Sequence, residues 1–257
     1  MLFRSKKVHP EVLFLAEAFT RPAMMHELGR VGFTQSYTYF TWRTGKQELT
    51  EYFTELTQTE MREYFRGNLF TNTPDILPFH LQTGGPAMFR IRAVLAATLS
   101  SVYGIYSGFE LCENAALPGR EEYFDSEKYQ LKERDWDAPG NIKPLITNLN
   151  RIRHENRALH FYDNLLFHPV DNDALLFYSK LTPARDSIVL VIVNLDPDHT
   201  QTGFVEVPVE EFGELFDATY EVHDLLTNDR YVWYGKRNYV ALHPSIQPAH
   251  IFRVRRL

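Results

Sequence analysis

Two acidic residues stand where they could take part in chemistry. Residues 12–16 form a run of five apolar residues, which predicts a strand buried on both faces, and Glu17 follows that run. A second short strand is predicted to begin at Leu69 and to stop at Pro74, and Asp75 comes next. Because parallel strands bring their carboxyl ends to one edge of a sheet, the two carboxyl groups could converge across a gap the size of a sugar.

A pair of carboxyl groups is suited to glycosyl transfer that retains the configuration of the anomeric carbon. Such a transfer uses a nucleophilic carboxylate and a second carboxyl that acts as acid and base, with a pKa raised by its surroundings. A third acid can hold the hydroxyl groups of the substrate. The residues alone leave structural interpretations open, because Glu17 is equally explained as a side chain that meets solvent where its strand stops. Asp75 is also typical of a turn after Pro74.

The elements that must position these residues divide the chain into two parts. Residues 1–158 alternate between strands and helices, which is typical of a parallel sheet, and about four such strands predict half of a (β/α)8 barrel. Residues 159–257 show short apolar or alternating segments between turn signals, which predicts an antiparallel β-sandwich. The predicted fold class is therefore α/β plus all-β, with domains at 1–158 and 159–257.

The expected elements of the first part are strands at 12–16, 32–40, 69–73 and 102–109, and helices at 23–30, 47–65, 84–99 and 142–159. A long polar and aromatic loop at 118–139 is of the kind that often carries function. The expected strands of the second part cover residues 175–179, 188–194, 203–207, 220–224, 230–234 and 250–254.

Composition excludes several classes of function. The chain has 257 residues, 44% of them hydrophobic and 23% charged, which is enough for a globular core. The net charge of -6 comes from interspersed acids and bases, so we expect no nucleic-acid partner. We see no signal peptide and no membrane span, and a single cysteine, Cys112, fits a reducing compartment, so we expect a cytoplasmic protein. His80, His154 and His160 lack metal-ligand spacing, and we expect no metal and no cofactor.

Four segments resemble the family of α-1,4-glucan:maltose-1-phosphate maltosyltransferases, a branch of the α-amylase clan (glycoside hydrolase family 13). The segments are residues 14–22 (FLAEAFTRP), 35–43 (QSYTYFTWR), 72–77 (NTPDIL) and 126–130 (SEKYQ). The resemblance is specific, because most of the clan has Asn-His-Asp where this sequence has Asn72-Thr73-Pro74-Asp75. This difference argues against the nearest rivals, an amylase or a trehalose synthase. The resemblance runs through almost the whole chain, over the C-terminal part of the enzyme.

The resemblance implies a retaining transfer of maltosyl units from α-maltose 1-phosphate to the non-reducing end of α-1,4-glucans, with release of phosphate, in glycogen-type polymer synthesis. It implies that Glu17 is the general acid/base, that Asp75 stabilises the transition state, and that Lys128 and Tyr129 line the donor sugar pocket. For Lys128 and Tyr129 the alternative is a solvated charge and a surface aromatic. The first strand would be the fifth of the barrel, which makes residues 1–158 its C-terminal half. The full-length family forms homodimers.

One family feature is missing from the sequence. The clan's nucleophile is an aspartate in a Gly-x-Arg-x-Asp pattern on the fourth barrel strand, and no such pattern occurs here. A double displacement needs that residue, because the covalent glycosyl intermediate forms on it. We therefore expect a fragment of a longer enzyme that is inactive alone and not necessarily dimeric. The alternative is a non-catalytic module, derived from a clan enzyme, that binds glucan or a partner chain.

Overall fold

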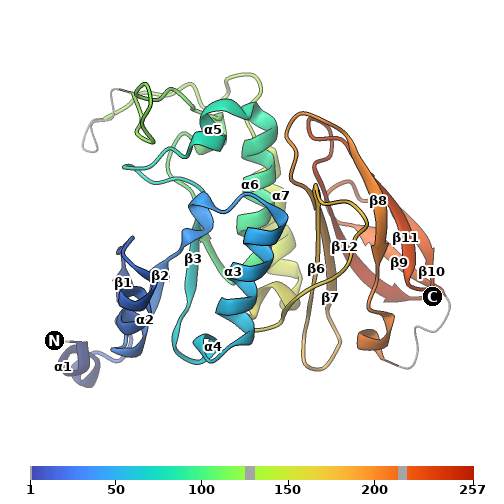
Figure 1. The fold of residues 1–257 in the computed structure, drawn as a ribbon, viewed down its shortest axis with the longest axis horizontal. Coiled ribbons are helices and arrows are strands. Elements are labelled where there is room, and N and C mark those ends of the chain that lie inside the picture. The colour runs from blue at the N-terminus through green and yellow to red at the C-terminus, as the bar shows by residue number, and fades with distance from the viewer. Residues whose placement is uncertain (1, 125–130, 214–218) are drawn as a thin grey trace.

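The computed structural model describes residues 2–124, 131–213 and 219–257, which form two parts that share a layer of helices (Figure 1). The elements of the first part are α1 (Leu2–Val8), β1 (Leu15–Ala16), α2 (Pro22–Arg30), β2 (Gln35–Tyr37), α3 (Lys46–Gln58), α4 (Met61–Tyr64), β3 (Gly67–Phe70), α5 (Phe79–Thr83), α6 (Gly85–Leu99), β4 (Val102–Gly104) and α7 (Lys143–Glu155). Those of the second part are β5 (Leu165–Phe167), β6 (Leu175–Leu181), β7 (Ile188–Asn194), β8 (Gln201–Glu206), β9 (Thr219–Asp224), β10 (Arg230–Tyr234), β11 (Arg237–Leu242) and β12 (Ala249–Arg256).

A parallel sheet organises the first part. Its strands lie in the order β1-β2-β3-β4, and every neighbouring pair is parallel. Helices separate consecutive strands along the chain, as the alternating sequence pattern predicted. The segments that follow β1, β2, β3 and β4 therefore all leave the sheet at its carboxyl edge.

The first strand is not buried on both faces, and this prediction was wrong. β1 covers only Leu15–Ala16, and Ala16 is buried whereas Leu13 and Leu15 are 63% and 56% exposed. The physical reason is its place in the sheet. In the described part of the chain β1 is an edge strand that pairs with β2 alone, and no neighbouring element covers Leu13 and Leu15.

Other elements of the first part also end earlier than the sequence predicted, among them the strand expected at 69–73 and the helix expected at 142–159. The strand expected at 32–40 ends at Tyr37, because the Thr38 side chain accepts a hydrogen bond from the Phe40 N–H and starts a 3₁₀ turn, Tyr39–Trp42. The strand expected at 102–109 ends at Gly104, before a turn in which Gly108 has a φ of 99°. The helix expected at 47–65 breaks at Thr59, whose backbone is extended, so that α3 and α4 are separate.

Helix α6 is the layer that joins the two parts. Of its 15 residues, all but Gly85, Pro86 and Arg90 are buried, so it is covered on every side. It lies between the parallel sheet and the strands of the second part (Figure 1). A hydrogen bond of 2.6 Å between the Thr98 hydroxyl and the Tyr178 hydroxyl links it to β6.

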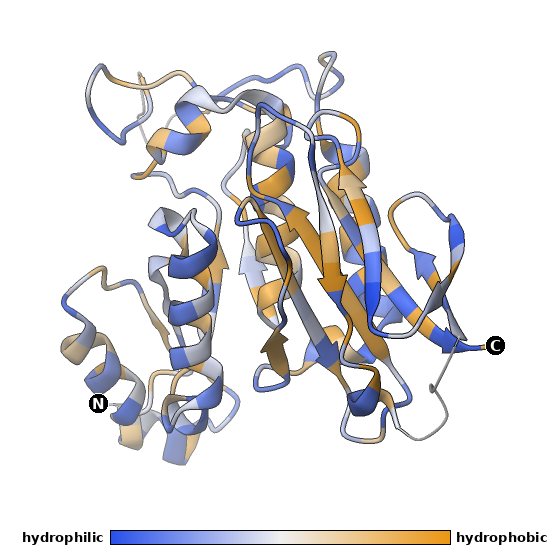
Figure 2. Ribbon diagram, turned by 45° about the vertical axis from the view of Figure 1, so that its right-hand side comes forward, coloured by the Kyte–Doolittle hydropathy of each residue, from blue (hydrophilic) through white to orange (hydrophobic). Residues whose placement is uncertain are grey.

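The second part is an antiparallel two-layer structure. Among the described residues its strands form a six-stranded sheet, in the order β10-β9-β12-β7-β6-β5, and a two-stranded sheet of β8 and β11. Alternate residues of β7 face opposite layers: Val189 and Val191 pack toward the helices, while Leu190 and Ile192 pack toward β8 and β11. Both faces are therefore covered, which explains the continuous apolar run of this strand, coloured as hydrophobic in Figure 2.

The expected strands of the second part are present, and the antiparallel architecture is confirmed. Residues 188–194 and 230–234 match β7 and β10 end to end. β5 and β11 were missed. β5 has only three residues, whereas β11 alternates between exposed Arg237, Tyr239 and Ala241 and buried neighbours, a period of two that the sequence does carry.

Candidate active site

Glu17 follows β1 directly, at the carboxyl edge of the parallel sheet, and its side chain is exposed. Aromatic contacts fix the segment behind it. The Phe19 ring meets the Trp42 ring edge-on at 5.2 Å and lies 5.5 Å from the Tyr37 ring. The Tyr39 hydroxyl donates a hydrogen bond to the carbonyl of the residue after Phe19. Phe19 thus ties the segment that carries Glu17 to the residues after β2.

Tyr37 shows that the Glu17 carboxylate lies near the end of β2. The pKa of Tyr37 is raised, first by burial and then by the negative charge of Glu17. The Glu17 carboxylate and the Tyr37 phenol thus lie near each other at the carboxyl edge of neighbouring strands.

Asp75 lies in the loop between β3 and α5, and its side chain is exposed. Asn72 fixes the start of this loop. Its Oδ1 accepts hydrogen bonds from the Tyr106 N–H (2.9 Å) and the Thr71 hydroxyl (3.0 Å), and its Nδ2 donates to the Tyr123 hydroxyl (2.6 Å). Asn72 is fully buried, so these bonds also satisfy a group that would be costly to leave unpaired.

The loop then makes a tight turn at Asp75. Thr73 and Ile76 exchange backbone hydrogen bonds of 3.0 and 3.2 Å, and the Asp75 N–H donates to the Thr73 hydroxyl at 3.2 Å. The turn interpretation of Asp75 is therefore correct as a description of the backbone. It does not exclude a role in chemistry, because the turn leaves the carboxylate exposed at the carboxyl edge of the sheet.

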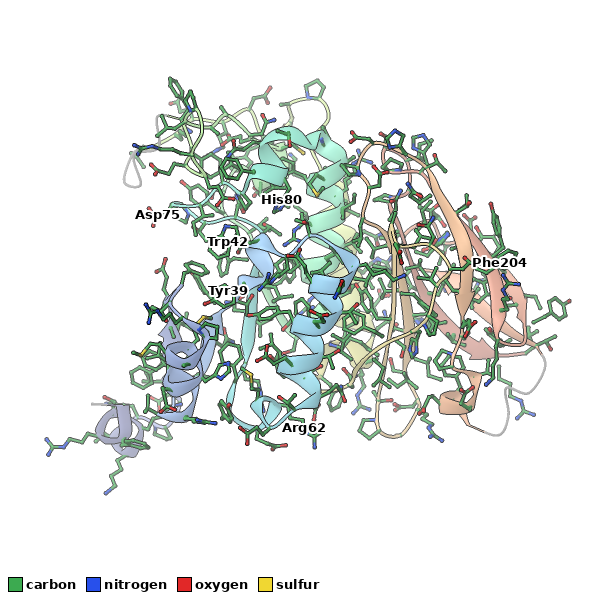
Figure 3. The ribbon with its side chains drawn as sticks, viewed as in Figure 1. Tyr39, Trp42, Arg62, Asp75, His80 and Phe204 are labelled. Atoms are coloured by element: carbon green, nitrogen blue, oxygen red, sulfur yellow. The ribbon has the colours of Figure 1, made fainter. Side chains whose placement is uncertain are left out.

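Glu121 fixes the end of the same loop. Its carboxylate accepts hydrogen bonds from the Trp42 indole N–H (2.8 Å) and the Phe79 N–H (3.1 Å), and its backbone carbonyl accepts one from the Leu77 N–H (2.9 Å). Sequence reasoning missed Glu121. Figure 3 shows Asp75, Trp42 and Tyr39 on one side of the molecule, far from Phe204 in the second part.

Glu17 and Asp75 thus follow two strands of one sheet, β1 and β3, with β2 between them. Neighbouring strands lie about 4.8 Å apart, so the ends of β1 and β3 are separated by roughly 10 Å along the same edge of the sheet. Lys128 and Tyr129 lie outside the described residues.

Other reactive side chains near this edge are inert. Burial, with a smaller effect of the Arg92 charge, lowers the pKa of His80 to about 2, so its imidazole is neutral. Burial raises the pKa of the Cys112 thiol to about 11, which disfavours a thiolate nucleophile. Within residues 2–124, 131–213 and 219–257 no cluster of three His, Cys, Asp or Glu could hold a metal ion. No helix in these ranges is long and apolar enough to span a membrane.

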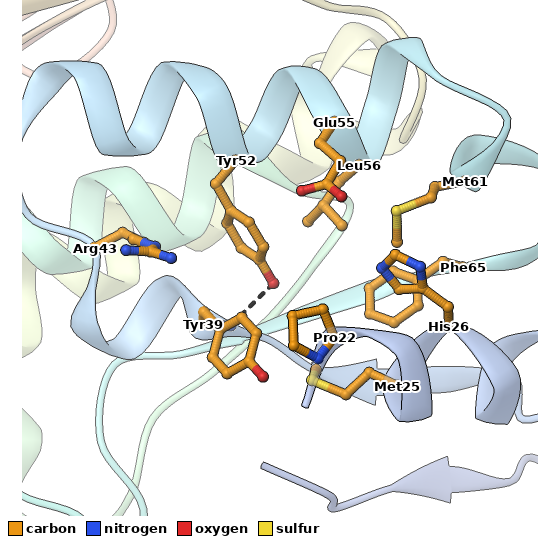
Figure 4. A pocket seen from close by; sticks show the side chains of 10 residues that line it. All are labelled: Pro22, Met25, His26, Tyr39, Arg43, Tyr52, Glu55, Leu56, Met61 and Phe65. Atoms are coloured by element: carbon orange, nitrogen blue, oxygen red, sulfur yellow. Dashed lines mark hydrogen bonds between the residues drawn. The ribbon is translucent and has the colours of Figure 1, made fainter. Parts of the chain in front are cut away.

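A small cavity of about 80 Å³ lies between α2 and α3 (Figure 4). Its lining residues are Pro22, Met25, His26, Tyr39, Arg43, Tyr52, Glu55, Leu56, Met61 and Phe65. The Tyr39 N–H donates a hydrogen bond of 3.0 Å to the Tyr52 hydroxyl across it, and burial raises the pKa of Tyr52. Ligand pockets usually measure about 300–1,000 Å³, so this cavity does not fit a disaccharide.

Solved structures define the class of fold. The chain is similar to an α-amylase from Anoxybacillus, with a TM-score of 0.71 and 16% identity over 100% of this chain and 55% of the amylase. It is also similar to the α-amylase of Geobacillus thermoleovorans, which was solved with acarbose, with a TM-score of 0.70 and 14% identity over 97% of this chain and 55% of that one. At such identities the comparison establishes the fold, which is shared with α-amylases.

Sequence relatives narrow this class. An α-1,4-glucan:maltose-1-phosphate maltosyltransferase of Rhodospirillum rubrum is 55% identical over 97% of this chain and 36% of its own length. The Myxococcus xanthus enzyme of the same name is 54% identical over 100% of this chain and 38% of its own length. Residues 167–254 match the family described as "GLGE, C-terminal". The chain is therefore a homologue of the C-terminal part of the α-1,4-glucan:maltose-1-phosphate maltosyltransferases, and it spans a little over a third of their length.

Proposed function

We propose that this chain forms the C-terminal part of a retaining maltosyltransferase, which moves maltosyl units from α-maltose 1-phosphate to the non-reducing end of α-1,4-glucans and releases phosphate. One observation carries the proposal. Identity above 50% to maltosyltransferases extends over nearly the whole chain, including the segments of Glu17 and Asp75 at the carboxyl edge of the parallel sheet. The parallel sheet and its helices, residues 1–158, are then the C-terminal half of a (β/α)8 barrel, and residues 159–257 are a β-sandwich domain.

Each carboxyl group has a distinct task in this reaction. Glu17 protonates the departing phosphate oxygen, and afterwards removes the proton from the 4-hydroxyl of the incoming glucan. Asp75 accepts hydrogen bonds from ring hydroxyls, and these bonds strengthen as positive charge develops on the sugar. The covalent intermediate forms on a nucleophilic aspartate that the 257 residues do not supply in a Gly-x-Arg-x-Asp pattern. We therefore expect no turnover by this chain alone.

A chimera tests the proposal directly. The matched 38% of the Myxococcus xanthus enzyme is replaced by this chain, and phosphate release from α-maltose 1-phosphate is measured with maltoheptaose as acceptor. We expect the chimera to be active and the isolated chain to be inactive. In the chimera, E17Q should lower kcat by about 10³-fold, because acid/base groups contribute about 10²–10⁴-fold. D75N should lower kcat/KM by a similar factor, because it weakens transition-state binding.

The control is E27Q, which changes an exposed glutamate in α2 and should leave kcat within twofold. A folded but inactive chimera beside an active parent enzyme would refute the proposal. Retention of glucan binding by that inactive protein, measured by migration in a glycogen-containing native gel, would then favour a binding module. Activity of the isolated chain would mean that its nucleophile lies within these 257 residues.

A further inference from the structure

We propose that Glu121 is the positioning residue that holds the Asp75 loop against the segment carrying Glu17. The inference deepens the proposed function and rests on it, because it assigns the geometry of the two carboxyl groups to a third residue. Glu121 lies in the segment after β4, on neither of the elements that carry Glu17 and Asp75.

The two oxygens of the Glu121 carboxylate serve two different segments. Oε2 accepts the Trp42 indole N–H at 2.8 Å, and Trp42 belongs to the 3₁₀ turn after β2. Oε1 accepts the Phe79 N–H at 3.1 Å, and Phe79 is the first residue of α5, where the Asp75 loop ends. Hydrogen bonds to an ionised acceptor are about twice as strong as neutral ones, so one half-buried carboxylate holds both segments.

A chain of contacts carries this constraint to Glu17. Trp42 meets Phe19 edge-on at 5.2 Å, and Phe19 is two residues beyond Glu17. On the other side, residues 72–79 are fixed at both ends, by the buried Asn72 at the start and by Glu121 at the finish. Asp75 lies between these two anchors. A change at Glu121 therefore releases one end of the Asp75 loop and one support of the Glu17 segment together.

The arrangement requires a carboxylate at position 121. Both partners are N–H donors, so both oxygens must accept. A glutamine has the same shape but only one accepting oxygen, and its NH₂ group would face either the indole N–H or the Phe79 N–H. E121Q therefore breaks one of the two bonds while it preserves volume, and W42F removes the indole donor without touching the Phe79 bond.

The first experiment measures hydrogen exchange in the 257-residue chain by NMR. E121Q removes one of the two hydrogen bonds, so we expect either the Trp42 indole N–H or the Phe79 amide to exchange at least about tenfold faster. If the Phe79 bond is the one lost, the amides of residues 76 and 77 should exchange faster as well, because one anchor of the loop is gone. The matched control is E122Q, whose side chain is exposed and lies 3.6 Å from Arg120. Unchanged exchange of the Trp42 and Phe79 protons in E121Q would overturn the proposal without any activity measurement.

The second experiment measures kinetics in the chimera described above. We expect E121Q to lower kcat by about 10–100-fold with little change in KM, because a small misplacement of catalytic groups costs about this much. W42F should lower kcat as well. E121A removes both accepting oxygens, so the W42F/E121A double variant should be no worse than E121A alone. E122Q should match the unsubstituted chimera.

The outcomes separate the two proposals. An inactive unsubstituted chimera refutes the proposed function, and with it the catalytic relevance of Glu121. An active chimera in which E121Q keeps kcat within twofold, while its exchange rates rise, overturns the positioning role and leaves Glu121 as a purely structural link. Additive losses in the W42F/E121A double variant would also overturn it, because they would show that Trp42 and Glu121 act separately.

Discussion

The parallel and antiparallel parts of the molecule use their residues differently. Strands β1–β4 have two to four residues, and each is followed by a segment that leaves the carboxyl edge. Strands β6, β7 and β12 have seven or eight residues and are covered on both faces. In the first part the candidate site residues lie beyond the strands, in segments held by contacts of Asn72, Trp42 and Glu121. In the second part the strands themselves form the core. The candidate site thus lies beyond the strands of the first part, whereas both parts contribute buried apolar residues to the core.

The sharpest test of this difference is a pair of leucine substitutions. Leu190 in β7 is fully buried between β8, β11 and β12, whereas Leu15 in β1 is 56% exposed. L190A should lower the free energy of unfolding by about 3–4 kcal/mol, because it removes buried methyl groups and leaves a cavity. L15A should cost less than about 0.5 kcal/mol. Urea unfolding of both variants measures the effect, and equal losses would contradict the comparison.

A buried lysine in the second part allows a test by pH. Lys180 in β6 is fully buried, and its ammonium donates a hydrogen bond of 2.7 Å to the Phe161 carbonyl. Burial, with a smaller effect of the Arg153 charge, lowers the pKa of Lys180 from 10.5 to about 7. Between pH 7 and 10.5 the unfolded chain therefore holds more protons than the folded one, and stability rises with pH.

We expect the free energy of unfolding to increase by about 2–3 kcal/mol from pH 7 to 9.5, since each unit of pKa difference corresponds to about 1.4 kcal/mol. In K180M this increase should disappear. The control is K236M, at an exposed lysine, which should retain the rise. Urea unfolding across this range measures both. A flat profile in the unsubstituted protein would show that Lys180 keeps its ordinary pKa in the folded state.

A buried polar side chain, Asn72, fixes the start of the Asp75 loop in the first part. N72A removes the side chain that joins Thr71, Tyr106 and Tyr123, and leaves these groups without their partner. We expect a loss of about 2 kcal/mol, because an unsatisfied buried donor costs about 1–3 kcal/mol. N114A, at an exposed asparagine, should cost far less. If thermal unfolding shows equal losses, Asn72 is not the anchor of the Asp75 loop.

The sequence predicted the second part well because its signals are local. A run such as 188–194 is apolar, β-branched and bounded by turns, so the strand is evident without knowledge of its partners. In the first part the apolar run at 12–16 carried the same signal, yet only Leu15 and Ala16 form a strand, because burial depends on what covers a sheet edge. Helix α6 was expected, but its burial on all sides was not. The helix is buried because it packs between two sheets, and the sequence around it does not show that both sheets lie against it.

The candidate site divides in the same way. Glu17 and Asp75 could be found because each follows a strand and lies in a segment with a family resemblance. Glu121 could not, because its carboxylate bonds to Trp42 and Phe79, which lie 79 and 42 residues away along the chain. Such contacts depend on the tertiary fold, and the spacing of residues in the sequence does not predict them.

The smallest expected effect tests the second part at acid pH. His168 lies against Phe177, and its Nε2 is 2.7 Å from the Ser179 hydroxyl. Burial lowers the pKa of His168 from 6.5 to about 4, although the Glu210 charge raises it slightly. As the pH falls from 6.5 toward 4, the unfolded chain binds a proton that the folded chain does not, so stability is lost over this window and is fully present above it. From pH 7 to 5 this residue should account for about 1–2 kcal/mol of the loss.

H168Q should therefore lose less stability than the unsubstituted protein over this range in urea unfolding, whereas H154Q, at an exposed histidine, should not differ from it. If both variants lose as much as the unsubstituted protein, His168 titrates normally in the folded state, and the acid sensitivity of the molecule lies elsewhere.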